Sequence, residues 1–157
     1  CVVGKDENGG YRVIKTALVT EALEAEGTTV KVNKSHLFAV GDFVTVGGDL
    51  KGASDRITAI DKSNAGYDVI TLEAKIGAAK VGQVLVGVKE KTTAGKATLV
   101  TSSSELVITL SKVDLTVANQ SCGLMVRGTI SEGNMPFPID AGLKALMPLI
   151  RFVNKKS

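Results

Sequence analysis

The stretch Ala39-Val40-Gly41-Asp42-Phe43-Val44-Thr45-Val46-Gly47 decides the fold class of this chain, because a close counterpart follows it 41 residues later. The counterpart is Lys80-Val81-Gly82-Gln83-Val84-Leu85-Val86-Gly87. In both copies a glycine and a polar residue precede a short, mostly apolar run that ends at another glycine. Glycine adopts positive φ at little cost, and such a run suits a pleated, buried surface. Each copy therefore predicts a turn leading into a buried strand, and we expect the two turns to be matching corners of one body.

The segments around these two copies have the pattern of short antiparallel strands. Residues 28–32, 56–60 and 67–72 alternate between apolar and polar side chains, and the loop 61–66 between the last two has hairpin composition. Other apolar runs also predict strands: 11–20, 106–110, 115–118, 123–130 and 149–153. Strands at such short intervals, without a long amphipathic helix, predict a mainly β fold, an antiparallel small barrel or sandwich.

One segment near the C-terminus predicts a short helix. Its apolar side chains recur at helical spacing, at Ile139, Leu143, Leu146 and Met147. Asp140 suits the positive end of the helix dipole, and Pro148 ends the helix. We expect residues 136–153 to form a helix–strand unit that closes the protein by packing on its own chain. The alternative is that this apolar unit docks onto a partner.

The length of 157 residues is most simply that of one domain with its own core. We expect residues 11–157 to form this single β-rich domain. Residues 1–10 end in an Asn-Gly-Gly turn signal and predict a flexible N-terminal arm. Within the domain, residues 89–104 are rich in charged and small side chains and predict an exposed loop region.

Composition excludes several classes of function. Basic residues number 19 and acidic residues 16, for a net charge of +3, and they are scattered along the chain. With six aromatic residues, no Trp and no dense basic block, we expect no nucleic-acid binding. No apolar run has the length of a transmembrane helix, so we expect no membrane partner. Cys1 leaves a processed, trimmed or lipidated terminus open, and a lipid there would anchor the protein to a membrane.

The residues that carry chemistry are too few and too scattered for an active site. His36 is the only histidine, and the residues around it show no nucleophile elbow or other catalytic signature, so we interpret it as structural. One histidine and the distant Cys1 and Cys122 do not form a zinc set, and Cys122 is expected to face the core. Three further acidic residues are interpreted as a solvated cluster: Glu21, Glu24 and Glu26.

The segment Asp61-Lys62-Ser63-Asn64-Ala65-Gly66-Tyr67-Asp68 has a weak similarity to a calcium-binding loop. It lacks an oxygen ligand at its fifth position, Ala65, and the bidentate carboxylate at its twelfth, Leu72. The hairpin interpretation is therefore preferred. Together these patterns predict no catalytic, cofactor-binding or metal site, no cofactor and no enzymatic activity.

Two stretches, Lys34–Val44 and Ile57–Leu72, resemble head fibre or head decoration proteins of tailed phages and prophages of gut Bacteroidales. The C-terminal part is similar to the ending of the same group at Val126–Glu132, Pro136–Pro138 and Leu146–Val153. The similarity extends over roughly residues 16–153, and its motifs are structural rather than catalytic.

This resemblance implies a non-enzymatic virion protein that decorates the phage head or forms fibres on it. It implies the major capsid protein as partner, assembly with copies of itself with a trimer favoured, and a place on the capsid surface after synthesis in the cytoplasm of the bacterial host. The alternative is a secreted or surface-anchored bacterial β-module that binds glycan or protein. Clustered exposed aromatic side chains would favour that alternative.

Overall fold

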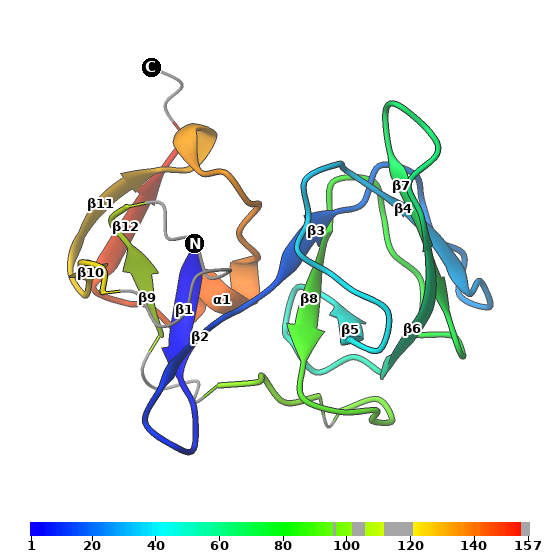
Figure 1. Ribbon diagram of the computed structural model, residues 1–157, viewed down its shortest axis with the longest axis horizontal. Helices are drawn as coiled ribbons and strands as arrows, with labels where there is room; N and C mark the ends of the chain where they lie inside the picture. Colours follow the sequence, from blue (N-terminus) through cyan, green and yellow to red (C-terminus); the bar gives the residue numbers. More distant parts are fainter. Residues whose placement is uncertain (96, 102–105, 112–120, 155–157) are drawn as a thin grey trace.

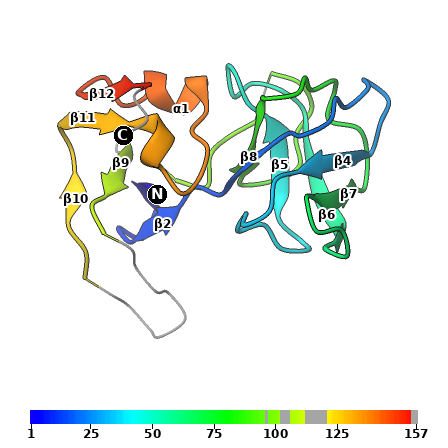
Figure 2. The ribbon, with the colours of Figure 1, turned by 90° about the horizontal axis from the view of Figure 1, so that it is seen from above.

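The computed structural model describes residues 1–95, 97–101, 106–111 and 121–154. These residues form two lobes that lie side by side (Figure 1, and from above in Figure 2). One lobe is a six-stranded antiparallel sheet, and the other combines a four-stranded antiparallel sheet, a pair of parallel strands and a short helix. The predicted mainly β fold, with antiparallel sheets and a short helix near the C-terminus, is confirmed.

The six-stranded sheet has the order β3-β8-β5-β6-β7-β4. Its strands are β3 (Thr16–Leu18), β4 (Thr29–Val32), β5 (Phe43–Val46), β6 (Ser54–Asp61), β7 (Asp68–Leu72) and β8 (Val84–Val88). The edge strands β3 and β4 are linked just beyond β3, at an isolated bridge between Val19 and Val32. Beside this bridge the Thr20 N–H donates to the Lys31 carbonyl at 2.9 Å. The sheet is therefore strongly curled around its apolar side chains, but no continuous ladder among the described residues joins its edges into a closed barrel.

The two repeated stretches form the corners that lead into β5 and β8. Gly41 and Gly82 have positive φ angles of 97° and 86°. The N–H of Gly41 donates to the Ile57 carbonyl, and the N–H of Gly82 donates to the Val19 carbonyl, both at 2.9 Å. Because β5 and β8 pair antiparallel, the corners lie at opposite ends of this pair. The prediction of matching corners in one body is confirmed.

The repeat extends beyond the corners to whole units of three strands. In each unit two strands precede a corner and a third strand follows it: β3, β4 and β5 in the first, β6, β7 and β8 in the second. With the β3–β4 bridge counted as a link, the six strands form a ring in the order β3-β8-β5-β6-β7-β4. If each strand of the first unit is exchanged with its counterpart in the second, every strand keeps the same neighbours in this ring. The curled lobe is thus an approximately two-fold arrangement of two equivalent β-β-β units.

The second lobe is assembled from both ends of the chain. Its four-stranded sheet has the order β10-β9-β1-β2, with β1 (Val2–Lys5), β2 (Tyr11–Val13), β9 (Leu106–Thr109) and β10 (Leu124–Met125). Strands β11 (Gly128–Ser131) and β12 (Ile150–Val153) pair in parallel. Between them lie the 3-10 helix η2 (Glu132–Asn134) and the helix α1 (Ala141–Ala145).

Several expectations for the ends of the chain are corrected. Residues 1–10 are not a flexible arm, because β1 pairs with both β2 and β9, and Val2 and Val3 are each only 5% exposed. The predicted strand 11–20 is two strands, β2 and β3, in different sheets. The predicted helix 139–147 is shorter, and the predicted strand 115–118 lies outside the described residues.

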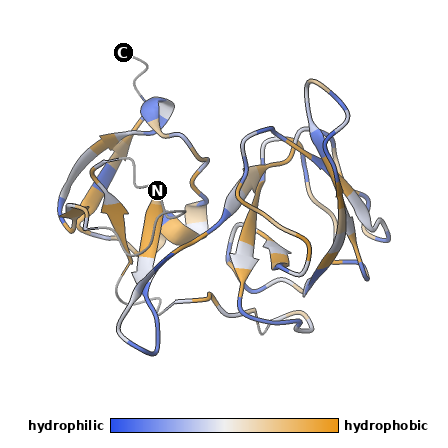
Figure 3. Cartoon of the chain, in the orientation of Figure 1, coloured by the Kyte–Doolittle hydropathy of each residue, from blue (hydrophilic) through white to orange (hydrophobic). Residues whose placement is uncertain are grey.

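Strand β8 belongs to the cores of both lobes. All five of its residues are buried. Leu85 packs in the core of the curled lobe, while Val84 and Val86 pack in the second core with Leu143 and Met147 of the C-terminal unit. Figure 3 shows hydrophobic residues along the strands of both lobes. Side chains of the C-terminal unit thus pack on their own chain in this structure, and the two lobes share one strand.

Candidate functional site

His36 lies in a buried polar cluster at the start of β7. Its side chain has 0% exposure, and its Nδ1 accepts a hydrogen bond from the Phe38 N–H at 3.2 Å. Its Nε2 lies 3.2 Å from Oδ2 of Asp68, a close polar contact without good hydrogen-bond geometry. The other carboxylate oxygen of Asp68 accepts from Lys34 Nζ at 2.6 Å. The cluster joins the chain after β4 to the first residue of β7.

This cluster holds a neutral histidine. Burial lowers the pKa of His36, and the Asp68 carboxylate opposes this effect only in part. Because Nδ1 accepts a backbone hydrogen bond, the single proton of the neutral ring is assigned to Nε2, which faces Asp68. The side chain is closed to solvent, so a substrate has no access to the ring. The arrangement fixes the corner between β4 and β5.

The segment 61–68 is the hairpin between β6 and β7. The Asp61 side chain accepts from the Ser63 N–H, and the Asn64 side chain accepts from the Gly66 N–H, both at 2.9 Å. These oxygen atoms therefore hold the turn, as expected for residues that bond their own backbone. In the part of the chain that the structure describes, no group of three His, Cys, Asp or Glu side chains is placed to hold a metal ion.

The other candidate residues from the sequence are dispersed. Glu21 pairs with Lys31, and Glu26 pairs with Lys75, on exposed parts of the curled lobe. Cys1 and Cys122 are free thiols and both are half-buried, so Cys122 is less buried than predicted. The structure does not bring any of these residues to His36.

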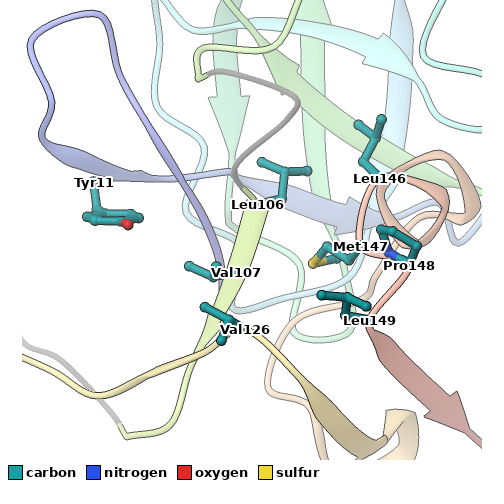
Figure 4. A pocket seen from close by; sticks show the side chains of 8 residues that line it. All are labelled: Tyr11, Leu106, Val107, Val126, Leu146, Met147, Pro148 and Leu149. Atoms are coloured by element: carbon teal, nitrogen blue, oxygen red, sulfur yellow. The ribbon is translucent and has the colours of Figure 1, made fainter.

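The feature that sequence reasoning missed is a surface groove of about 340 Å³ on the second lobe, lined mostly by apolar side chains. Figure 4 shows side chains from four separate segments around it. The lining residues are Tyr11, Leu106, Val107, Val126 and the run Leu146–Leu149. Three of them are exposed large apolar side chains: Tyr11 at 52%, Val126 at 64% and Leu149 at 58%. All of these lining side chains are uncharged, so the groove suits an apolar occupant.

The local structure explains how these segments meet. The Gly128 N–H donates to the Leu149 carbonyl at 3.3 Å, which ties the chain after Val126 to the chain after α1. Tyr11 begins β2, the edge strand of the four-stranded sheet. No local pattern predicts this groove, because its walls come from segments far apart in the sequence. The only signal was the apolar C-terminal unit, residues 136–153.

The exposure of the aromatic residues bears on glycan binding. All six aromatic residues lie in the described parts of the chain, and Tyr11 is the one that is predominantly exposed. Phe38 is buried and the others are half-buried: Phe43, Tyr67, Phe137 and Phe152. Sugar-binding surfaces that depend on stacking need aromatic faces open to solvent. The described residues therefore lack the clustered exposed aromatics that would favour a glycan-binding module.

Comparison with known proteins identifies no relative. The chain matches no protein-family model, no curated protein and no solved structure. Among the described residues, no helix has both the length and the apolar character needed to cross a membrane. The fold and the groove are therefore the basis on which a function is proposed.

Proposed function

We propose that this protein is a non-enzymatic structural component of a tailed-phage virion, which binds the major capsid protein and decorates the head or forms fibres on it. The observation that carries the proposal is the uncharged groove with three exposed apolar side chains, Tyr11, Val126 and Leu149. Exposed apolar side chains gathered around one groove are typical of surfaces that bind another protein. A protein-binding surface is the use that suits this groove best.

The resemblance to head fibre and decoration proteins supports the same proposal. Lys34–Val44 includes the buried His36 and the corner before β5, and Ile57–Leu72 includes the β6–β7 hairpin. In these two stretches the resembling residues frame the curled lobe, whereas the resembling C-terminal stretches Val126–Glu132 and Leu146–Val153 lie in the second lobe. Similarity carried by structural rather than catalytic motifs suits a protein whose function is to assemble.

The proposed function also implies where the protein is made, where it acts and how it assembles. The protein is made in the cytoplasm of the bacterial host and acts on the capsid surface of the virion. The resemblance implies that it also assembles with copies of itself, with a trimer favoured.

A binding experiment with assembled capsids tests the proposal. Capsids are built from the major capsid protein encoded beside the gene of this chain, mixed with increasing amounts of folded protein, and separated on a density gradient. The expected result is saturable co-sedimentation at a fixed ratio to the capsid subunit. A folded protein that stays at the top of the gradient at every concentration would reject the proposal. Binding to a glycan array instead would favour the bacterial surface module.

A further inference from the structure

We infer that the groove binds an apolar side chain carried by an acidic segment of the capsid partner. This inference rests on the proposed function and adds the chemistry of the partner and the face that docks. The groove itself provides the apolar half of the recognition. Val126 and Leu149 are exposed along it, and the buried Val107 and Met147 also line it.

The charge of the second lobe provides the other half. Each described carboxylate of this lobe already has a partner within the chain. Asp6 pairs with Arg12, Glu7 with Lys89, and Glu132 with Lys144. The remaining one, Asp140, is buried and accepts from the Gly142 N–H at the start of α1. These contacts leave the described acidic charge of the lobe compensated or buried.

Two arginines beside the groove have no such partner. Arg127 directly follows Val126, and Arg151 lies two residues beyond Leu149 on the neighbouring strand. Both are exposed, and neither forms an ion pair with any residue that the structure describes. Because these exposed, unpaired arginines lie within two residues of the groove-lining Val126 and Leu149, they place uncompensated positive charge close to the groove.

The apolar lining and the two unpaired arginines together indicate which chemical groups the occupant carries. Arginine binds carboxylates in a bidentate manner and is enriched, together with tyrosine, among the residues that dominate protein interfaces. An occupant with an apolar side chain flanked by Asp or Glu would fill the groove and pair with Arg127 and Arg151. A second copy of this chain fits less well, because it would bring the same unpaired arginines to the contact.

The test compares matched substitutions on the two lobes in the capsid-binding experiment. Val126→Glu alters the groove, and Val81→Glu is its control, because Val81 is 65% exposed at a corner of the curled lobe. Arg127→Glu and Arg151→Glu reverse the rim charge, and Lys51→Glu makes the same change of charge on the curled lobe. Leu149→Ser is a second groove variant, and thermal unfolding checks that each variant is folded.

We expect both groove variants and both arginine variants to weaken capsid binding by about tenfold or more, while both controls bind like wild type. Binding by wild type is also expected to weaken with rising salt, and less steeply in the arginine variants. Folded groove variants that bind capsids like wild type would overturn the inference but not the proposed function. A change of oligomeric mass in light scattering with unchanged capsid affinity would identify a second copy as occupant and would also overturn it. If wild type binds no capsid, the proposed function and this inference both fail.

Discussion

Asp42 and Gln83 occupy equivalent positions in the two halves of the curled lobe. The Asp42 carboxylate accepts a hydrogen bond from the Ala39 N–H at 2.8 Å, and the Gln83 amide oxygen accepts one from the Lys80 N–H at 2.7 Å. In both cases the side chain bonds the backbone three residues earlier, across a glycine of positive φ. A carboxylate and an amide perform the same task because either oxygen is a suitable acceptor. The repeat in the sequence is thus a repeat of turn chemistry.

The first prediction concerns the two corner glycines. Gly41→Ala and Gly82→Ala should each lower the free energy of unfolding by about 1 kcal/mol, because an alanine at positive φ is strained even in open space. Gly66→Ala is the control, since Gly66 lies in an exposed turn without a positive φ and has only ordinary contacts. Urea unfolding measures all three. Equal stability of the corner variants and the control would contradict the assigned corner geometry.

The second prediction concerns β8, the strand that both lobes share. Leu85→Ala should destabilise the curled lobe, and Val86→Ala should destabilise the second lobe, because each side chain is fully buried in a different core. Truncations of this kind cost about 2–5 kcal/mol for leucine and somewhat less for valine. Because both side chains lie on one strand, we expect a single cooperative transition in calorimetry for wild type and for both variants.

Separate transitions would contradict this second prediction. Two resolved heat-capacity peaks, with Leu85→Ala lowering only one of them, would mean that the lobes unfold independently. Ala59→Gly, at an exposed position of β6, is a suitable control for general strand weakening.

The third prediction is a loss of stability on mild acidification. Burial lowers the pKa of His36 in the folded protein, so the unfolded chain binds the proton more readily. The stabilising effect of the neutral ring is therefore complete above the unfolded pKa of about 6.5 and is lost as the pH falls toward the folded pKa. The charges around the ring are Asp68, Lys62 and Lys34. Urea unfolding from neutral to mildly acidic pH measures the effect.

The matched variant for this third prediction is His36→Gln. It retains a polar side chain but does not titrate, so its stability should change less over the same pH range. The same slope in wild type and His36→Gln would contradict the assignment of a buried neutral histidine.

The fourth prediction concerns the contact between Gly47 and Asp140, which joins the two lobes. A side chain at position 47 would place its first carbon 2.2 Å from Asp140 Oδ1 and 2.6 Å from the Val84 carbonyl oxygen. Gly47→Ala should therefore destabilise the protein by about 1–3 kcal/mol. Asp140→Ala, which removes the hydrogen bond from the Gly142 N–H, should cost about 1 kcal/mol.

A double variant that combines Gly47→Ala with Asp140→Ala shows how much of the destabilisation comes from contact between the two side chains. With Asp140 shortened to alanine, the substituted side chain at position 47 no longer meets the carboxylate, while its clash with the Val84 carbonyl remains. The combined loss should therefore be smaller than the sum of the single losses. Strict additivity in urea unfolding would show that position 47 and Asp140 are not in contact.

The parts of the fold that were predicted correctly from the sequence depend on local chemistry. At 41–42 and 82–83 a glycine and a polar side chain form a local turn, because the polar side chain bonds the backbone three residues earlier. The hairpin loop 61–66 likewise bonds its own backbone. The alternation of apolar and polar side chains predicted β4, β6 and β7, because a half-buried strand presents one face to the core and the other to solvent.

The errors arose where distant segments determine the structure. Val2 and Val3 are too few to signal a strand, and they form one only because β9, far along the chain, lies beside them. The run 11–20 is apolar over most of its length, so nothing local marks Ile14 and Lys15 as the link between two sheets. The parallel pairing of β11 and β12 requires a long crossover, which α1 provides, and the helix alone did not reveal that pairing. The groove was not predicted for the same reason, because its lining residues come from segments far apart in the sequence.

The most direct test of the central claim is an electron cryo-microscopy reconstruction of cognate capsids incubated with saturating protein. We predict ordered additional density at symmetry-equivalent capsid positions, into which the two lobes fit with Val126 and Leu149 toward the shell. Bare capsids, in the presence of excess folded protein, would contradict the claim that this chain is a head decoration or fibre protein.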